Sequence, residues 1–153
     1  RQALGQEVPS GGESAGAPAV PEAMLRNGER DMVDAVNEER RKVGVPELEI
    51  DQNLMGWAQH WAKHLTTEFR HSDIDEERAY AAQQGLSPSD VYSQENITGG
   101  STDLNNVVER HMNNFMTSEG HRNTILDSDW TRVGIGYAVG PTGSLYCLQE
   151  FGL

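Results

Sequence analysis

The sequence predicts a layered α+β domain, in which amphipathic helices are followed by a β-hairpin. Two strongly one-sided helical patterns occupy the central part of the chain. From about residue 133 the large apolar residues occur at every second position instead, as in a β-strand. Helices first and strands last favour an α+β arrangement over a parallel, doubly wound sheet. The chain has 153 residues, which is long enough for one domain with a core.

The N-terminal stretch differs from the rest in composition. Residues 1–28 are rich in Gly, Ser, Ala, Pro and Glu and contain almost no large apolar side chains. Such a segment cannot bury enough surface to offset its chain entropy. We therefore predict a flexible linker or tail over 1–28 and a domain over 29–153. The chain begins at Arg1 rather than at Met, which suggests a processed fragment.

Three helices are predicted from apolar spacing. The first covers about residues 29–43. The second follows Asp51, a good N-cap residue, and the third carries the same pattern over residues 104–115. The stripe of the second helix consists of Leu54, Trp57, Ala58, Trp61, Ala62 and Leu65.

The C-terminal region reads as a β-hairpin. Large side chains alternate with small ones over residues 133–139, the turn GPTGS follows, and residues 145–151 form an apolar run. Gly134 and Gly136 face away from the large side chains, which leaves room for another element, such as a helix, against that face. We expect residues 66–100 to be mostly irregular, with a short helix near 76–83.

Charge and cysteine content narrow the functional classes. The chain has 12 Lys and Arg against 24 Asp and Glu, a net charge of -12, which repels nucleic acid and anionic lipids. Cys147 is the single cysteine, so no intrachain disulfide forms, and its strand-like surroundings indicate a small buried hydrophobe. No apolar run has the length of a transmembrane helix.

The five histidines fall into two groups. His60 and His64 stand four apart on the second helix but lack the intervening Glu of an HExxH motif, so we interpret them as partly exposed structural residues. His111 lies in the apolar stripe of the third helix and is interpreted as a core histidine with a satisfied hydrogen bond. His71 and His121 lie instead in polar segments, beside other functional side chains.

These polar segments carry the candidate site. His71 lies in FRHSD, Glu95 in QENI, and Glu119 and His121 in SEGHR. Two imidazoles and two carboxylates suit a zinc-like cation if the fold brings them together, whereas the alternative is four ordinary loop residues. Gly120 is expected to break the chain after the third helix and to direct His121 into a cleft, with Ser118 as the cap of the next turn.

The motifs HS, QENI, FMTSEGHRNTIL, VGIGYAV and LYCLQEFG together resemble the CAP superfamily, also called SCP-like domains, in its compact prokaryotic form. The resemblance covers about residues 29–153. It implies a three-layer α-β-α sandwich with a small central antiparallel sheet flanked by helices. It also implies export, which would place the protein outside the cell or at the cell envelope. A separate alternative is a structural or envelope-associated module, with residues 1–28 as its tether.

The family has a cavity lined by two His and two Glu that binds a divalent cation in some members. Carried over by motif, these residues fall on His71, Glu95 and His121, with Glu119 as the fourth and Glu109 as a second candidate for that position. His71 and His121 would then be the metal ligands, and zinc or magnesium the cation. GHRNT replaces the GHYTQ of eukaryotic members, and Gln94 replaces the usual glycine before ENI.

The resemblance favours a binding module over an enzyme. We expect an exported domain whose cleft takes a divalent cation, a small apolar ligand such as a lipid, or an extracellular partner. The alternative is a metal-assisted hydrolase or protease that uses the His/Glu cleft, in which a neighbouring Glu takes a proton from bound water. No GxSxG or HExxH motif occurs in the sequence to support this chemistry.

Overall fold

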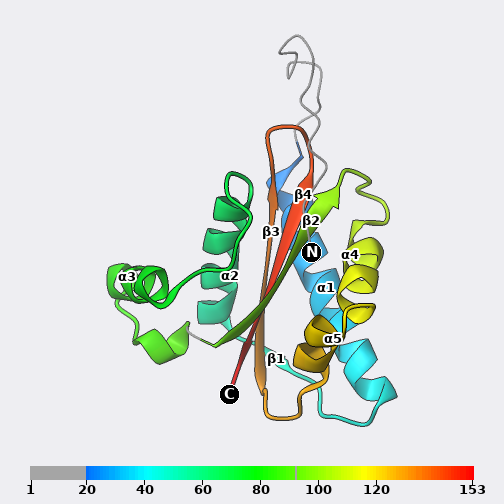
Figure 1. Ribbon diagram of the computed structural model, residues 1–153, viewed down its shortest axis with the longest axis horizontal. Coiled ribbons are helices and arrows are strands. Elements are labelled where there is room, and N and C mark those ends of the chain that lie inside the picture. The colour runs from blue at the N-terminus through cyan, green and yellow to red at the C-terminus, as the bar shows by residue number, and fades with distance from the viewer. Residues whose placement is uncertain (1–19, 92) are drawn as a thin grey trace.

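The computed structural model describes residues 20–91 and 93–153. Figure 1 shows a central sheet, with α2 (Gln52–Leu65) and α3 (Ile74–Gln84) on one side and α1 (Glu22–Lys42) on the other. Two further helices, α4 (Val107–Met116) and α5 (Glu119–Leu126), lie on the side of α1 (Figure 1). The predicted three-layer α-β-α sandwich is confirmed.

Within the described residues four strands form one sheet in the order β1-β3-β4-β2. The hairpin of β3 (Arg132–Val139) and β4 (Leu145–Gly152) is antiparallel, as predicted. Two strands are not where the sequence indicated. The stretch predicted to be irregular contains β2 (Gln94–Ser101), antiparallel to β4, and the short β1 (Glu49–Ile50) is parallel to β3.

Helix α1 begins at Glu22, so it includes residues 22–28, which the sequence analysis assigned to the tail. Residues 1–19 lie outside the described residues, and the predicted tail there stays a prediction. Arg40 lies in the last turn of α1 and anchors this end of the helix. Its fully buried guanidinium donates to the carbonyls of Pro46, Ile125 and Asp127 at 2.7–2.9 Å. This side chain thus joins α1 to the end of α5.

Helix α2 forms as predicted, and the Asp51 side chain accepts from the backbone N–H of Leu54 at 2.9 Å as an N-cap. It lies directly on the glycines of β3. A Cβ atom at Gly134 would lie 2.2 Å from the carbonyl carbon of Leu54, and one at Gly136 2.1 Å from the carbonyl oxygen of Ala58. The glycines therefore permit the backbone of a helix to approach the sheet closely.

The other helices match the prediction in part. Helix α3 and its capping box at Asp73 lie where a short helix was expected. Helix α4 begins at Val107, three residues later than the pattern over residues 104–115 indicated. Gly120 is helical within α5 and does not break the chain; the break lies at Thr117 and Ser118, and the Ser118 side chain makes no cap hydrogen bond.

Side chains on the two faces of the sheet fill two separate cores. Along β4, Tyr146 and Leu148 pack with Trp57 and Trp61 of α2, whereas residues 145, 147 and 151 pack with α1 and α4. Cys147 is fully buried in the second of these cores, as predicted. Each face of the sheet therefore has its own helix layer and its own set of buried residues.

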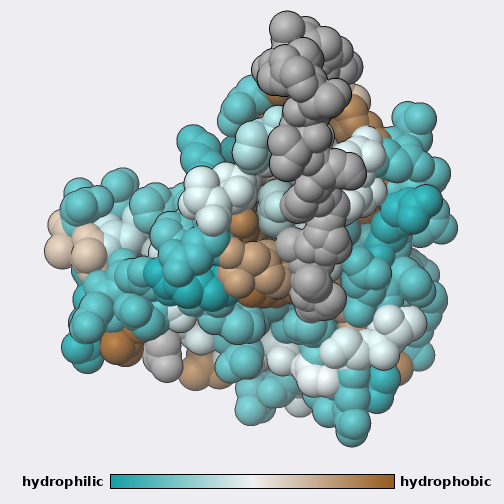
Figure 2. Space-filling view, turned by 45° about the horizontal axis from the view of Figure 1, so that its top comes forward, coloured by the Kyte–Doolittle hydropathy of each residue, from teal (hydrophilic) through white to brown (hydrophobic). Residues whose placement is uncertain are grey.

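The outer surface is mainly polar. Figure 2 shows hydrophilic residues over most of one face, with apolar residues in small separate areas. None of the helices described is both long enough and apolar enough to cross a membrane.

Candidate functional site

A cluster of buried carboxyl groups lies between β2, β4 and the helices of the α2 layer. Glu95 and Glu150 are directly opposite each other across the β2–β4 pair and are 9% and 1% exposed. His71 Nδ1 lies 3.2 Å from Glu95 Oε1, and the backbone N–H of Ser72 donates to the same oxygen at 2.9 Å. The structure thus brings together two of the four predicted site residues, His71 and Glu95.

The two facing carboxyl groups have opposite protonation tendencies. Burial, reinforced by the negative charge of Glu95 and a hydrogen bond to it, raises the pKa of Glu150 well above its usual value. Burial alone would also raise the pKa of Glu95, but hydrogen bonds from His71, Ser72 and Glu150 outweigh this effect and hold it below its usual value. Glu150 therefore carries the proton that the pair shares.

Two neutral donors complete the environment of Glu150. Trp57 Nε1 of α2 donates to Oε1 at 3.0 Å, and Ser93 Oγ donates to Oε2 at 3.0 Å. The hydrogen bond to Glu95 raises the pKa of His71, so the ionised Glu95 faces an imidazole that readily becomes positive.

A third carboxyl group reaches the cluster through Ser72. The Ser72 hydroxyl lies 2.7 Å from Glu77 Oε2 and 2.9 Å from Glu95 Oε2. A hydroxyl has one proton, so it donates to one of these two oxygens at a time. Burial raises the pKa of Glu77, and the hydrogen bond from Ser72 opposes this rise.

The other two predicted residues lie on α5, on the opposite side of β2. Consecutive residues of a strand point to opposite faces, and Asn96, next to Glu95, donates to the main-chain carbonyl of His121 at 3.2 Å. The His121 ring packs edge-on against Phe115 of α4, with ring centroids 5.3 Å apart. Glu119 is exposed in the first turn of α5, and Glu109 is exposed on α4. The segments of His71 and His121 are thus anchored to neighbouring residues of β2 from opposite faces.

A zinc site requires three or four protein ligands. Among the residues that the structure describes, no group of three or more His, Cys, Asp or Glu side chains is placed to hold a metal ion. The cluster supplies His71 and the ionised Glu95 as ligands, whereas burial raises the pKa of Glu150 well above its usual value and keeps it neutral. This donor set does not form a complete metal site, so a cation bound by His71 and His121 stays a prediction.

The remaining histidines pack against aromatic side chains, and of the two ring nitrogens of His111 only Nδ1 has a hydrogen-bond partner among the described residues. His60 is exposed and His64 half-buried; His64 stacks on Trp61 at 4.1 Å and bonds to Glu68 at 3.1 Å. His111 is fully buried on α4, where its Nδ1 lies 2.9 Å from the hydroxyl of Tyr137. Burial lowers the pKa of His111 to about 4, so this ring is neutral.

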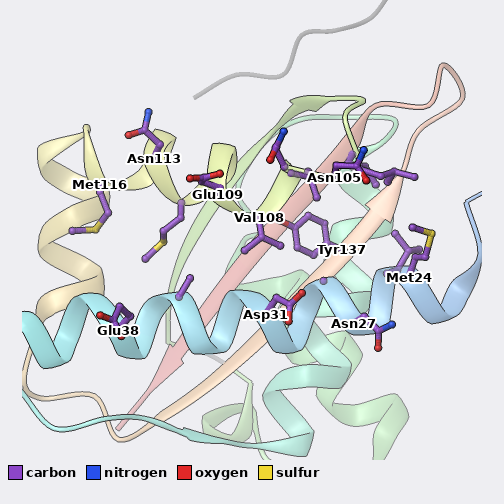
Figure 3. A pocket seen from close by; sticks show the side chains of 18 of the residues that line it. Met24, Asn27, Asp31, Glu38, Asn105, Val108, Glu109, Asn113, Met116 and Tyr137 are labelled. Carbon is purple, nitrogen blue, oxygen red and sulfur yellow. The ribbon is translucent and has the colours of Figure 1, made fainter.

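A second feature lies on the other face of the molecule, a groove of about 650 Å³ between α1 and α4. Figure 3 shows side chains of the two helices facing each other across it, with Tyr137 of β3 between them. The apolar part of its wall includes Leu25, Val108, Met112, Met116, Tyr137 and Leu145. Its volume is within the roughly 300–1,000 Å³ typical of small-molecule sites.

Sequence reasoning missed Glu150 and this groove. Glu150 is a charged residue inside the apolar run LYCLQEF, and a buried acid of that kind is usually paired, which was an available signal. The groove forms between helices separated by more than 60 positions in the chain, so local patterns carry no signal for it.

Comparison with known proteins identifies the family. Residues 33–151 match the CAP, or cysteine-rich secretory protein, family, and the chain belongs to that family in a prokaryotic type. It is 30% identical over 126 residues to the protein YkwD of Bacillus subtilis, a match that covers 81% of this chain and 47% of that protein. The chain thus spans about half the length of this curated relative.

Solved structures share the fold. An outer surface protein of Borrelia burgdorferi has a TM-score of 0.65 at 19% identity, covering 84% of this chain and 93% of that one. The CAP domain of enterococcal PrgA has a TM-score of 0.64 at 17% identity, covering 88% and 64%. An extracellular SCP-domain protein of Bacillus anthracis has a TM-score of 0.63 at 17% identity, covering 90% and 45%. Proteins of similar structure therefore include outer-surface and extracellular ones.

Proposed function

We propose that this chain is an exported binding module that holds a small apolar ligand in the groove between α1 and α4. The observation that carries the proposal is the groove itself, whose wall is continuous with the core at Met112, Tyr137 and Leu145. An alkyl chain placed there would be removed from water by residues that already pack against the sheet. Export is supported by the outer-surface and extracellular proteins of similar structure. A tether to the cell envelope through the N-terminal tail is part of the same proposal.

The expected affinity is modest. Burial of a ten-carbon chain contributes about 8 kcal/mol at about 0.8 kcal/mol per methylene. Lost translational and rotational freedom costs at least about 4 kcal/mol of this. At most about 4 kcal/mol remains, which corresponds to a dissociation constant of about 1 mM or weaker, so ligands must be titrated to millimolar concentration.

The test is displacement of the uncharged fluorescent probe N-phenyl-1-naphthylamine by decyl maltoside, kept below its micelle concentration. Ala35 is half-buried and lines the groove, so Ala35→Phe would fill part of it. Ala79 is exposed on α3, in the other helix layer, and Ala79→Phe serves as the matched control. We expect the first variant to lose binding and the second to keep it; equal binding by both would refute the proposal.

The divalent cation is a second proposal, supported by the contact between His71 and the ionised Glu95. Binding would use His71, Glu95 and His121 and would displace protons from neighbouring carboxyl groups. Calorimetric titration with zinc and with magnesium should then show proton release that is lost in His71→Ala and His121→Ala and retained in His60→Ala. Unchanged heats in the first two variants would remove both residues as ligands. The metal-assisted hydrolase depends on the same cation, and the same titration decides whether that alternative survives.

A further inference from the structure

The charges around the groove are of one sign. The residues that line it include four acids, Asp31, Glu38, Glu39 and Glu109, and among these described lining residues there is no Lys, Arg or His. The whole chain has one basic residue for every two acidic ones, 12 against 24, so basic residues are fewer here than the composition predicts. The groove is therefore more acidic than the protein as a whole.

Two of the four acids have nearby cations outside the groove. Glu38 pairs with Arg41, and Glu39 pairs with Lys42 at 3.2 Å, both within α1. Asp31 and Glu109 have no ion-pair partner within 4 Å among the described residues. The charge that remains uncompensated at the groove is thus that of Asp31 and Glu109.

These two carboxylates lie on facing helices. Figure 3 shows Asp31 on α1 and Glu109 on α4, with Val108 and Tyr137 between them. Both residues are exposed, so their charged groups are in water while the wall between them is apolar. Tyr137 forms the floor of the groove, and its pKa is raised mainly by burial, then by Cys147 and Glu29, with Asp31 as the smallest contribution.

From this arrangement we infer that the groove selects amphiphiles with a positively charged head group, such as an alkylammonium, over those with a carboxylate head. The inference rests on the proposed function, since the alkyl chain is held by the same apolar wall. A cationic head at the mouth would lie between Asp31 and Glu109 and gain from both charges. A fatty-acid carboxylate in the same position would meet two like charges and no basic partner among the lining residues.

The test compares three ligands of equal chain length: decyltrimethylammonium, uncharged decyl maltoside and decanoate, each below its micelle concentration. We expect the ammonium compound to bind on the order of tenfold more tightly than decanoate, since each exposed charge pair contributes a factor of about two to five. The preference should shrink when NaCl is raised from 20 to 200 mM, because salt screens exposed charges.

A charge-neutralised variant, Asp31→Asn with Glu109→Gln, should bind the three ligands with similar affinity. The control, Glu49→Gln with Asp75→Asn, changes the net charge equally at exposed positions outside the groove and should keep the preference. Equal affinity of the wild type for all three head groups would overturn the inference and leave the proposed function standing. Failure of all three ligands to bind would overturn both.

Discussion

Substitution of Gly136 by Ala is the sharpest test of how the α2 layer is held. Gly136 lies in β3 directly under α2, and an added Cβ would meet the carbonyl oxygen of Ala58 at 2.1 Å and the backbone nitrogen of Gln59 at 2.6 Å. Ordinary contact begins at 3.4 Å, so α2 must move away from the sheet by about 1.3 Å. These atoms are helix backbone and cannot rotate aside as a side chain would.

The expected cost is at the upper end of overpacking effects, about 3 kcal/mol or more. For a domain of this size that lowers the melting temperature by about 10 °C. Displacement of α2 would also lengthen the 3.0 Å hydrogen bond from Trp57 Nε1 to Glu150 Oε1, so the tryptophan fluorescence should change in the folded state.

The assay is urea unfolding at pH 7, followed by circular dichroism and by tryptophan fluorescence. Gly120→Ala is the control, because Gly120 is exposed and helical and a Cβ there meets nothing within 4 Å. That variant should gain about 0.5–1 kcal/mol from the higher helix propensity of Ala. If Gly136→Ala unfolds within 1 kcal/mol of the wild type, the close approach of α2 to β3 is refuted.

Three further predictions concern buried polar groups. Because burial lowers the pKa of His111 from 6.5 to about 4, the unfolded chain binds a proton that the folded chain lacks. About 3 kcal/mol of stability, fully present above pH 6.5, should therefore be lost as the pH falls to 4. The variant His111→Gln should lack this loss. Parallel curves of unfolding free energy against pH for the two proteins would contradict the prediction. At pH 7, Glu150→Gln should change the unfolding free energy by less than about 1 kcal/mol, since an amide replaces an uncharged carboxyl group. Glu95→Gln should instead lower the unfolding free energy by about 2–4 kcal/mol, because it removes an ionised acceptor. Equal costs would show that the proton is assigned to the wrong residue. Arg40→Lys should cost about 2–4 kcal/mol in urea unfolding, because one ammonium cannot reach the three carbonyls that the guanidinium binds, and a loss below 0.5 kcal/mol would exclude that role.

Local patterns predicted the parts of the fold that are set by short-range contacts. The stripe of α2 and its cap at Asp51 depend on residues within one or two turns of each other, and both were predicted correctly. The alternation of β3 with Gly134 and Gly136 predicted the hairpin and the element that packs against it.

The same reasoning was wrong where the partner is distant in the chain. Residues 94–101 are polar and contain two glycines, so their own composition does not favour a strand. They form β2 because β4, about fifty positions later, supplies backbone hydrogen-bond partners. The motif containing Glu95 was consequently placed in a loop, although it lies in an edge strand of the sheet.

The candidate site, too, was predicted from the sequence only in part. The motifs indicated His71, Glu95, Glu119 and His121, and the structure joins the first two directly. By itself the sequence determined the residue types of the site and the nearby helix α2, because that helix depends on neighbours along the chain. Tertiary structure alone decided that Glu150 faces Glu95 and keeps its proton, and that α1 and α4 enclose an acidic-rimmed groove. Protonation and enclosure depend on burial by distant segments, and that burial exists only once the chain has folded.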